Sequence, residues 1–248
     1  EMLSHLPTGE TNRCVFRTAH EVRIWPLRIS DARMHAAGLP RDYPAVEDAR
    51  AAISITLEST IGQPLAALRQ LDELTFFLRD MKDRDLGAYR LYELIFGSLC
   101  DVGIRALPDG REGAPVDGAG RFEFLGPRSI GRVGFRDDEA LLPRTRRGFQ
   151  GYRLLREYFF FDQRFLFFRL KGIQRAVEAL QGKRVELVFF LKEPPGGMER
   201  LAEAEVSAER FSLFATPAAN VFARSAQVTP SDRSSDFIVI PNKKDPLD

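Results

Sequence analysis

Alternation between apolar and polar residues predicts the first strands of this chain. From Ala52 to Ser59, isoleucine and leucine alternate with serine, threonine and glutamate, which is typical of a half-buried strand. The segment from Cys14 to Ile29 alternates less regularly around Trp25-Pro26 and predicts an edge or bent strand, because proline cannot donate a ladder hydrogen bond. Prolines and a glycine between Met34 and Ala49 predict a loop.

Further along, the pattern predicts two strand–helix–strand units. The first contains a strand at Leu74–Arg79, a helix at Asp85–Leu99 with Asp85 as its N-cap, and a strand at Val102–Leu107. The second contains a strand at Phe165–Leu170, a helix at Ile173–Leu180 stopped by Gly182, and a strand at Val185–Leu191. The pattern leaves open whether the strands of each unit are parallel.

A glycine-rich connection separates the two units. It runs from Gly110 to Gly126, contains five glycines, and marks the best candidate for a domain boundary. We therefore expect an α+β protein with mixed β-sheets, a few short helices and two lobes, at residues 1–112 and 113–248. Between the units, Phe122–Leu125 and Ser129–Phe135 are expected to pair as a hairpin, and Tyr152–Phe161 to form a helix.

The aromatic residues are unevenly distributed among types. The chain has 20 Phe, 5 Tyr and 1 Trp. Because phenylalanine has no polar group, most of these rings are expected in a core or an interface. The runs Tyr158–Phe161 and Phe165–Phe168 are expected to belong to the core first, the second in a strand covered on both faces.

Charge and cysteine content narrow the function classes. The formal net charge is +1, so no global field favours nucleic acid or an anionic membrane. Two distant cysteines, Cys14 and Cys100, suggest no disulfide framework and fit a reducing cytoplasm. The sequence shows no signal peptide, and its apolar runs are too short for a membrane span, so we expect no direct membrane insertion.

Motifs for catalysis or metal binding are missing from the sequence. Asp137-Asp138-Glu139 lacks the spaced ligands of a calcium loop, which favours a solvated turn over a cation site. His5, His20 and His35 have no zinc spacing, and no glycine-rich phosphate loop occurs. We expect no catalytic residue, cofactor or metal. A hydrolase site assembled from scattered acids stays open as a rival.

The arginine-rich loop Pro143–Phe149 has three interpretations. It is a self-paired solvated loop, a protein interface, or a contact for nucleic acid through Arg144 to Arg147. We expect a subunit contact here and a nucleic-acid-binding module as the alternative. The candidate interface residues are Leu141, Leu142, Pro143, Arg144, Arg147, Phe149, Tyr152, Leu155 and Tyr158.

The segment Gly134 to Leu170, GFRDDEALLPRTRRGFQGYRLLREYFFFDQRFLFFRL, resembles the signature block of the TssF (ImpG, VasA) family. Three other blocks are similar to the family in the same order. They are CVFRT at residues 14–18 with WPL at 25–27, the segment 74–95, and FSLFATPAANVF at 211–222.

The resemblance implies a structural, non-enzymatic subunit of the type VI secretion system baseplate. Such a subunit assembles with TssG into a wedge with TssK and TssE, possibly beside another TssF copy. The wedges surround the spike of a contractile injection machine, in the cytoplasm at the inner membrane, and support polymerisation of the sheath. No nucleic acid is implied as a partner. Family members extend beyond both ends of this chain, so we expect a central piece.

Overall fold

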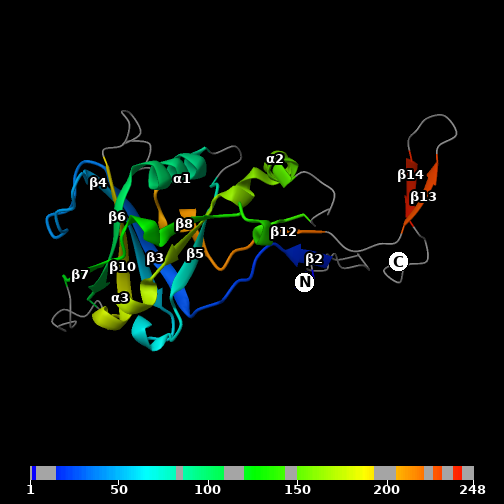
Figure 1. Cartoon of the computed structure of the whole chain (residues 1–248). Coiled ribbons are helices and arrows are strands. Elements are labelled where there is room, and N and C mark those ends of the chain that lie inside the picture. The colour runs from blue at the N-terminus through cyan, green and yellow to red at the C-terminus, as the bar shows by residue number, and fades with distance from the viewer. Residues whose placement is uncertain are drawn as a thin grey trace.

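The computed structural model describes residues 2–3, 15–81, 86–108, 120–142, 150–192, 205–220, 226–230 and 237–241. Its strands are β1 (Met2–Leu3), β2 (Val15–Thr18), β3 (Leu27–His35), β4 (Ala51–Ser59), β5 (Glu73–Leu78), β6 (Leu99–Leu107), β7 (Phe122–Phe124), β8 (Ile130–Val133), β9 (Phe167–Lys171), β10 (Arg184–Leu191), β11 (Phe211–Leu213), β12 (Ala218–Ala219), β13 (Ala226–Pro230) and β14 (Phe237–Pro241). Its α-helices are α1 (Gly87–Ser98), α2 (Gln150–Phe161) and α3 (Ile173–Leu180), and its 3-10 turns are η1 (Leu65–Ala67), η2 (Pro127–Ser129), η3 (Asp137–Glu139), η4 (Asp162–Phe165) and η5 (Ala208–Arg210). The expected α+β class is confirmed (Figure 1).

Two sheets form the body of the molecule. One has the strand order β3-β4-β10-β6-β7, and the other has the order β11-β5-β9-β8. Both expected strand–helix–strand units are present, and each helix connects a strand of the second sheet to a strand of the first. The strands of the two units then pair antiparallel, β5 with β9 and β6 with β10. The two units therefore interlock instead of standing side by side.

The interlocking bears on the expected division of the chain. The boundary expected between residues 112 and 113 lies outside the described residues. Strands from before and after it share both sheets, because β10 lies between β4 and β6, and β9 lies beside β5. A division at that point would run between hydrogen-bonded strands.

One hydrophobic core joins the two sheets and the helices α1 and α3. An edge-on contact between Phe168 of β9 and Phe189 of β10, with centroids 5.9 Å apart, crosses from sheet to sheet. The other face of the first sheet carries a smaller cluster around Val188 and Phe190, against which Tyr43 packs. Tyr43 belongs to the loop between β3 and β4, which covers this face of the sheet. β4 is therefore buried on both faces, where alternation alone predicted a half-buried strand.

Other predictions about the strands need correction. Phe122–Leu125 and Ser129–Phe135 do not pair as a hairpin, since β7 pairs with β6 and β8 pairs with β9. Gly126, with φ of 81°, and the turn η2 carry the chain from one sheet to the other. The segment Cys14–Ile29 holds two strands, β2 and the start of β3, instead of one. The expected cap Asp85 lies outside the described residues.

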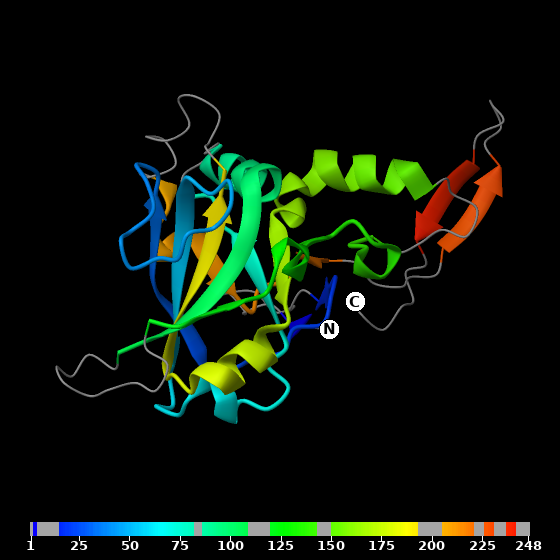
Figure 2. The same ribbon diagram turned by 60° about the vertical axis from the view of Figure 1, so that its left-hand side comes forward.

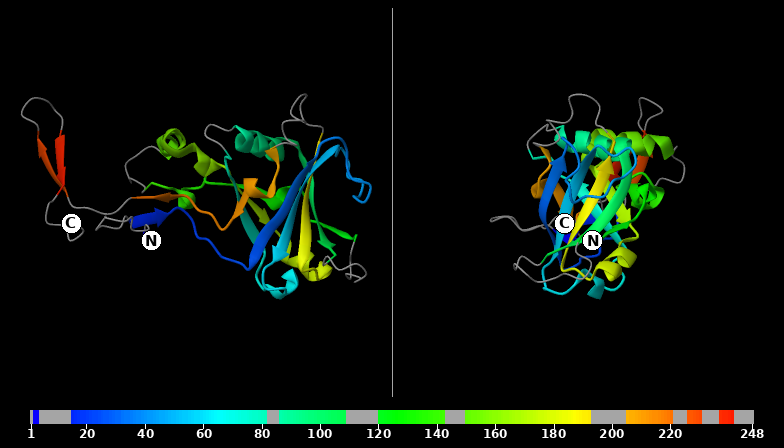
Figure 3. Two further views of the ribbon diagram at one scale, coloured as in Figure 1. Left: turned by 180° about the vertical axis from the view of Figure 1, so that it is seen from behind. Right: turned by 90° about the vertical axis from the view of Figure 1, so that its left-hand side faces the viewer.

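Two smaller sheets complete the fold. β1, β2 and β12 form a three-stranded sheet, and β13 pairs with β14 in a two-stranded ribbon. The ribbon stands apart from the main sheets in Figure 1 and in the view from behind (Figure 3, left). Helix α2 extends away from the two large sheets instead of covering one of their faces (Figure 2). This places α2 where its outer side is accessible.

Candidate protein interface

The acidic turn η3 is held to the end of β8 by a buried carboxylate. Glu139 is 5% exposed, and its Oε2 accepts hydrogen bonds from the backbone N–H groups of Gly134 at 2.7 Å and Arg136 at 3.2 Å. Gly134 has a φ of 100°, and a Cβ there would lie 2.9 Å from the carbonyl oxygen of Arg164. Glycine at this position and glutamate at position 139 thus close the turn together.

The prediction of a solvated turn is right for two of the three acids only. The side chains of Asp137 and Asp138 are 49% and 65% exposed, and they pair with Arg153 at 3.4 Å and Arg136 at 2.8 Å. Glu139 instead points inward and satisfies backbone donors. Within the described residues, no group of three or more His, Cys, Asp or Glu side chains is arranged to hold a metal ion.

A second buried carboxylate attaches α2 to this turn. Glu157 is fully buried, and its Oε1 accepts hydrogen bonds from the backbone N–H groups of Leu141 and Leu142, both at 3.1 Å. Its Oε2 accepts a hydrogen bond from Arg153 at 3.0 Å and forms an ion pair with the fully buried Arg164. Glu157 therefore connects α2 both to the backbone at Leu141 and Leu142 and to the side chain of Arg164.

Arg164 joins the helix to the acidic turn. Its Nη2 donates a hydrogen bond to the backbone carbonyl of Glu139 at 2.7 Å. Burial, and to a lesser extent Arg153, lowers the pKa of Arg164 to about 10, so the guanidinium stays charged at neutral pH. Together Glu139, Arg153, Glu157 and Arg164 form what we call the anchor network, which sets the position and rotation of α2.

Helix α2 reverses the usual arrangement of buried and exposed side chains on a surface helix. A surface helix normally buries an apolar stripe and exposes its charges. Over residues 152–161 of α2, where burial is described, the one fully buried side chain is the charged Glu157, while the exposed side chains include six apolar or aromatic ones. Their exposed fractions are 65% for Tyr152, 55% for Leu155, 51% for Tyr158, 81% for Phe159, 82% for Phe160 and 37% for Phe161. Several large apolar side chains exposed on one helix are typical of a protein interaction site.

The expectation that the two aromatic runs belong to the core is half right. Phe165–Phe168 are buried, with Phe168 stacked on Phe76 at 5.0 Å and Phe167 on Phe77 at 4.5 Å. Tyr158–Phe161 are exposed, including Phe160 and Phe161, which follow Glu157 by three and four residues and so lie on its side of the helix. The sequence carries no local signal for this orientation, because an Arg and a Glu one helical turn apart normally form an exposed ion pair.

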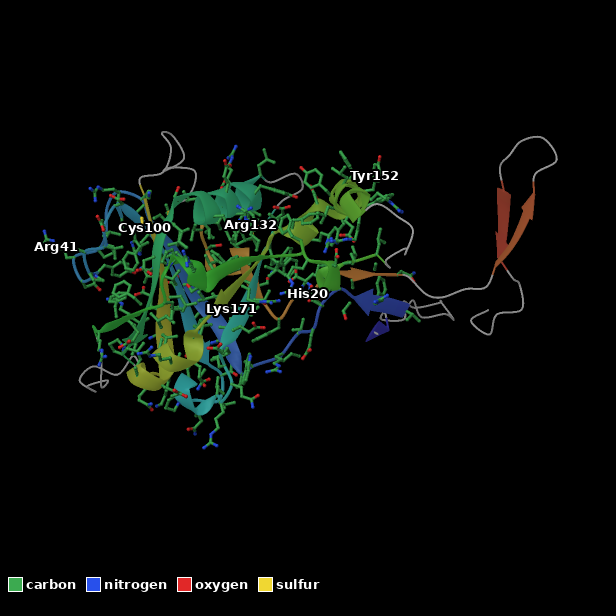
Figure 4. All side chains as sticks on the ribbon, in the orientation of Figure 1. His20, Arg41, Cys100, Arg132, Tyr152 and Lys171 are labelled. Carbon is green, nitrogen blue, oxygen red and sulfur yellow. The ribbon has the colours of Figure 1, made fainter. Side chains whose placement is uncertain are left out.

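The candidate interface residues divide into three groups. Tyr152, Leu155 and Tyr158 are exposed on α2. Leu141 is buried and Leu142 partly buried, and both serve the anchor network through their N–H groups. Pro143, Arg144, Arg147 and Phe149 lie outside the described residues. Figure 4 shows Tyr152 on α2, on the side of the molecule opposite Arg41 and Cys100.

A polar cleft of about 580 Å³ lies near the anchor network, lined in part by His20, Glu73, Glu139 and Arg169. Arg169 lies 3.9 Å from Glu73 and 3.8 Å from Glu139, so cation and carboxylates offset one another. Burial lowers the pKa of His20, whose ring lies edge-on to Phe167 at 5.4 Å. The charges of Arg169, Glu73 and Glu139 in the cleft therefore offset one another through ion pairs within the protein.

Two further features complete the description. Cys100 is a free, partly exposed thiol on β6, and burial raises its pKa. In the part of the chain that the structure describes, no helix has the length and apolar character needed to cross a bilayer.

Comparison with known proteins gives three related findings. The family model "Type VI secretion system, TssF" matches residues 1–248. The chain is 38% identical over 247 residues to a curated protein of Pseudomonas aeruginosa, "Type VI secretion system component TssF1". That match covers 98% of this chain but 37% of the relative, so the chain spans little more than a third of that relative's length.

Among solved structures, the fold is similar to a chain in the cryo-electron microscopy structure of a type VI secretion system TssK–TssF–TssG baseplate subcomplex. The TM-score is 0.58, with 88% of this chain and 36% of that chain covered. Sequence identity over the match is 21%, so this likeness shows the fold alone.

Proposed function

Because the chain belongs to the TssF family of the type VI secretion system, we propose that it is a structural part of the secretion baseplate, held there by contacts with TssG and TssK. The similar fold in a TssK–TssF–TssG baseplate subcomplex supports these two partners. By the same proposal, TssE and a second TssF copy are further neighbours in the wedge. The baseplate lies in the cytoplasm against the inner membrane and supports assembly of sheath and tube.

The observation that carries this proposal is the exposed aromatic surface of α2. A fixed helix that buries a glutamate and exposes Phe159 and Phe160 is costly for a protein that works alone, because the rings stay in water. An assembly subunit recovers that free energy when a neighbour covers the rings. Within the cleft, Arg169 pairs with Glu73 and Glu139, and the proposal includes no catalytic step.

Co-purification of the full-length protein tests the proposal. We expect TssG and TssK to be identified by mass spectrometry with the tagged protein from cells that express the whole secretion system. Recovery of the protein without either subunit, from cells in which both are present, would contradict the proposed function.

The arginine-rich loop provides a second test. Pull-down of TssG by Arg147→Glu combined with Phe149→Ala should be weaker than by the unchanged protein, if the segment from Leu141 to Tyr158 lies near the contact. The rival function as a nucleic-acid-binding module predicts salt-dependent binding to DNA or RNA, and its absence at low salt would dismiss that rival.

A further inference from the structure

We infer that α2 binds a partner protein as a single docking helix, inserting the stripe Tyr152, Leu155 and Phe159 into an apolar groove with carboxylates at its rim. The inference rests on the proposed role in an assembly and specifies which side of which helix makes the contact. It follows from the rotation of α2, its spacing of apolar residues and its exposed charge.

The rotation of α2 is set by Glu157, which faces the body. At about 100° per residue, Tyr152, Leu155 and Phe159 lie about 140–160° around the helix axis from Glu157. They are 65%, 55% and 81% exposed. This outer stripe therefore points directly away from the anchor network.

The spacing of the outer stripe suits a groove. Its residues stand at positions i, i+3 and i+7, which is the pattern by which a helix places anchors into an apolar groove of another protein. A 12-residue helix is about 18 Å long, enough to present all three side chains along one line. Aromatic anchors of this kind carry a large share of the binding free energy at interfaces.

The charge of α2 indicates the rim of the groove. Arg156 is exposed beside the stripe, whereas the one acidic residue of the helix, Glu157, is buried. Two copies of α2 packed together would bring arginines near one another, so charge complementarity favours a different protein with acidic residues around the groove.

The neighbouring residue Phe160 provides a matched control. It has the same side chain as Phe159 and nearly the same exposed fraction, 82% against 81%, but lies about 100° further around the helix. Replacing either ring with alanine makes the same chemical change on the same helix. A difference between the two variants therefore reports the orientation of α2 in the contact and not general hydrophobicity.

Photo-crosslinking in cells tests the inference independently of the partner's identity. p-Benzoylphenylalanine is placed at position 159 or 160 of the full-length protein in cells that express the whole secretion system. We expect a protein adduct from position 159 and little from position 160, with the linked peptide in an apolar segment flanked by Asp or Glu. No adduct from position 159, equal adducts from both, or an adduct to another part of the same chain, to a second copy or to nucleic acid would overturn it.

Affinity for a purified TssK–TssG subcomplex separates this inference from the proposed function. If the unchanged protein binds, Phe159→Ala should weaken the affinity at least about tenfold, and Phe160→Ala less than about threefold. Arg156→Glu should weaken it more than Arg156→Lys, and more strongly at low salt. Binding that is equally sensitive or equally insensitive to both phenylalanine changes overturns the stripe while leaving the function in place. If the unchanged protein does not bind, the proposed partners are wrong, and the crosslinks alone decide the inference.

Discussion

Replacing Glu157 with glutamine should destabilise the protein by removing one member of a fully buried ion pair. Both Glu157 and Arg164 are fully buried, so the change leaves the guanidinium charged in a poorly solvated site. The new amide group also turns N–H donors toward Arg153 and Arg164, which are donors themselves.

The expected magnitude follows from what is lost and what is kept. Removing one partner of a buried ion pair costs about 3–5 kcal/mol. Glutamine keeps one oxygen that can accept the N–H groups of Leu141 and Leu142, so the lower end of that range applies. We therefore expect the free energy of unfolding to fall by about 3 kcal/mol, which lowers the melting temperature by roughly 6–12 °C for a chain of this size.

Urea unfolding followed by circular dichroism measures this loss. Glu93→Gln makes the same change at an exposed position of α1 and should alter the free energy of unfolding by less than about 0.5 kcal/mol. Arg164→Met should also be destabilising, and the double variant should lose less than the sum of the single losses, because neither charge is then left alone. A loss under about 1 kcal/mol for Glu157→Gln, or additive losses in the double variant, would refute the reasoning.

Three further predictions test the packing and the charges around α2. Gly134→Ala should lower the free energy of unfolding by about 1–3 kcal/mol in urea titrations, since the new Cβ would meet the carbonyl of Arg164, whereas Gly97→Ala has open space in a helix and should be neutral or stabilising. Phe167→Ala should cost about 3–5 kcal/mol in the same assay because the ring is buried, and the exposed Phe160→Ala should cost under about 0.5. Burial lowers the pKa of His20 below 6.5, so the unfolded chain binds more protons than the folded one, and stability should fall as the pH drops through about 6.5. In His20→Gln the urea midpoint should fall less steeply between about pH 7.5 and 5.5. Equal slopes for the variant and the unchanged protein would contradict this origin of the pH dependence.

Local periodicity was sufficient for most of the secondary structure. The helix expected at Ile173–Leu180 has the bounds observed for α3, because four apolar residues on one side and Gly182 after the end determine it locally. The strand expected at Val185–Leu191 is β10 with one added residue. The pairing was not predictable in this way, since η2 sends β7 and β8 to different sheets.

The candidate site, like the strand pairing, was predictable from the sequence only in part. The residues of α2 were expected to lie near a contact, and three of them, Tyr152, Leu155 and Tyr158, are exposed. Phe159 and Phe160 were assigned to the core on composition, yet they are the most exposed rings of the helix. Composition describes what a ring prefers, whereas exposure depends on how the folded chain places the helix.

The sequence by itself determined where most helices and strands form, that the protein is rich in phenylalanine, and which family it resembles. Only the tertiary structure decided that the inner side of α2 belongs to Glu157, because that choice depends on Arg164 and on the N–H groups of Leu141 and Leu142. A buried charge is tolerated only where such partners converge, and their convergence is a property of the folded chain, not of any short segment.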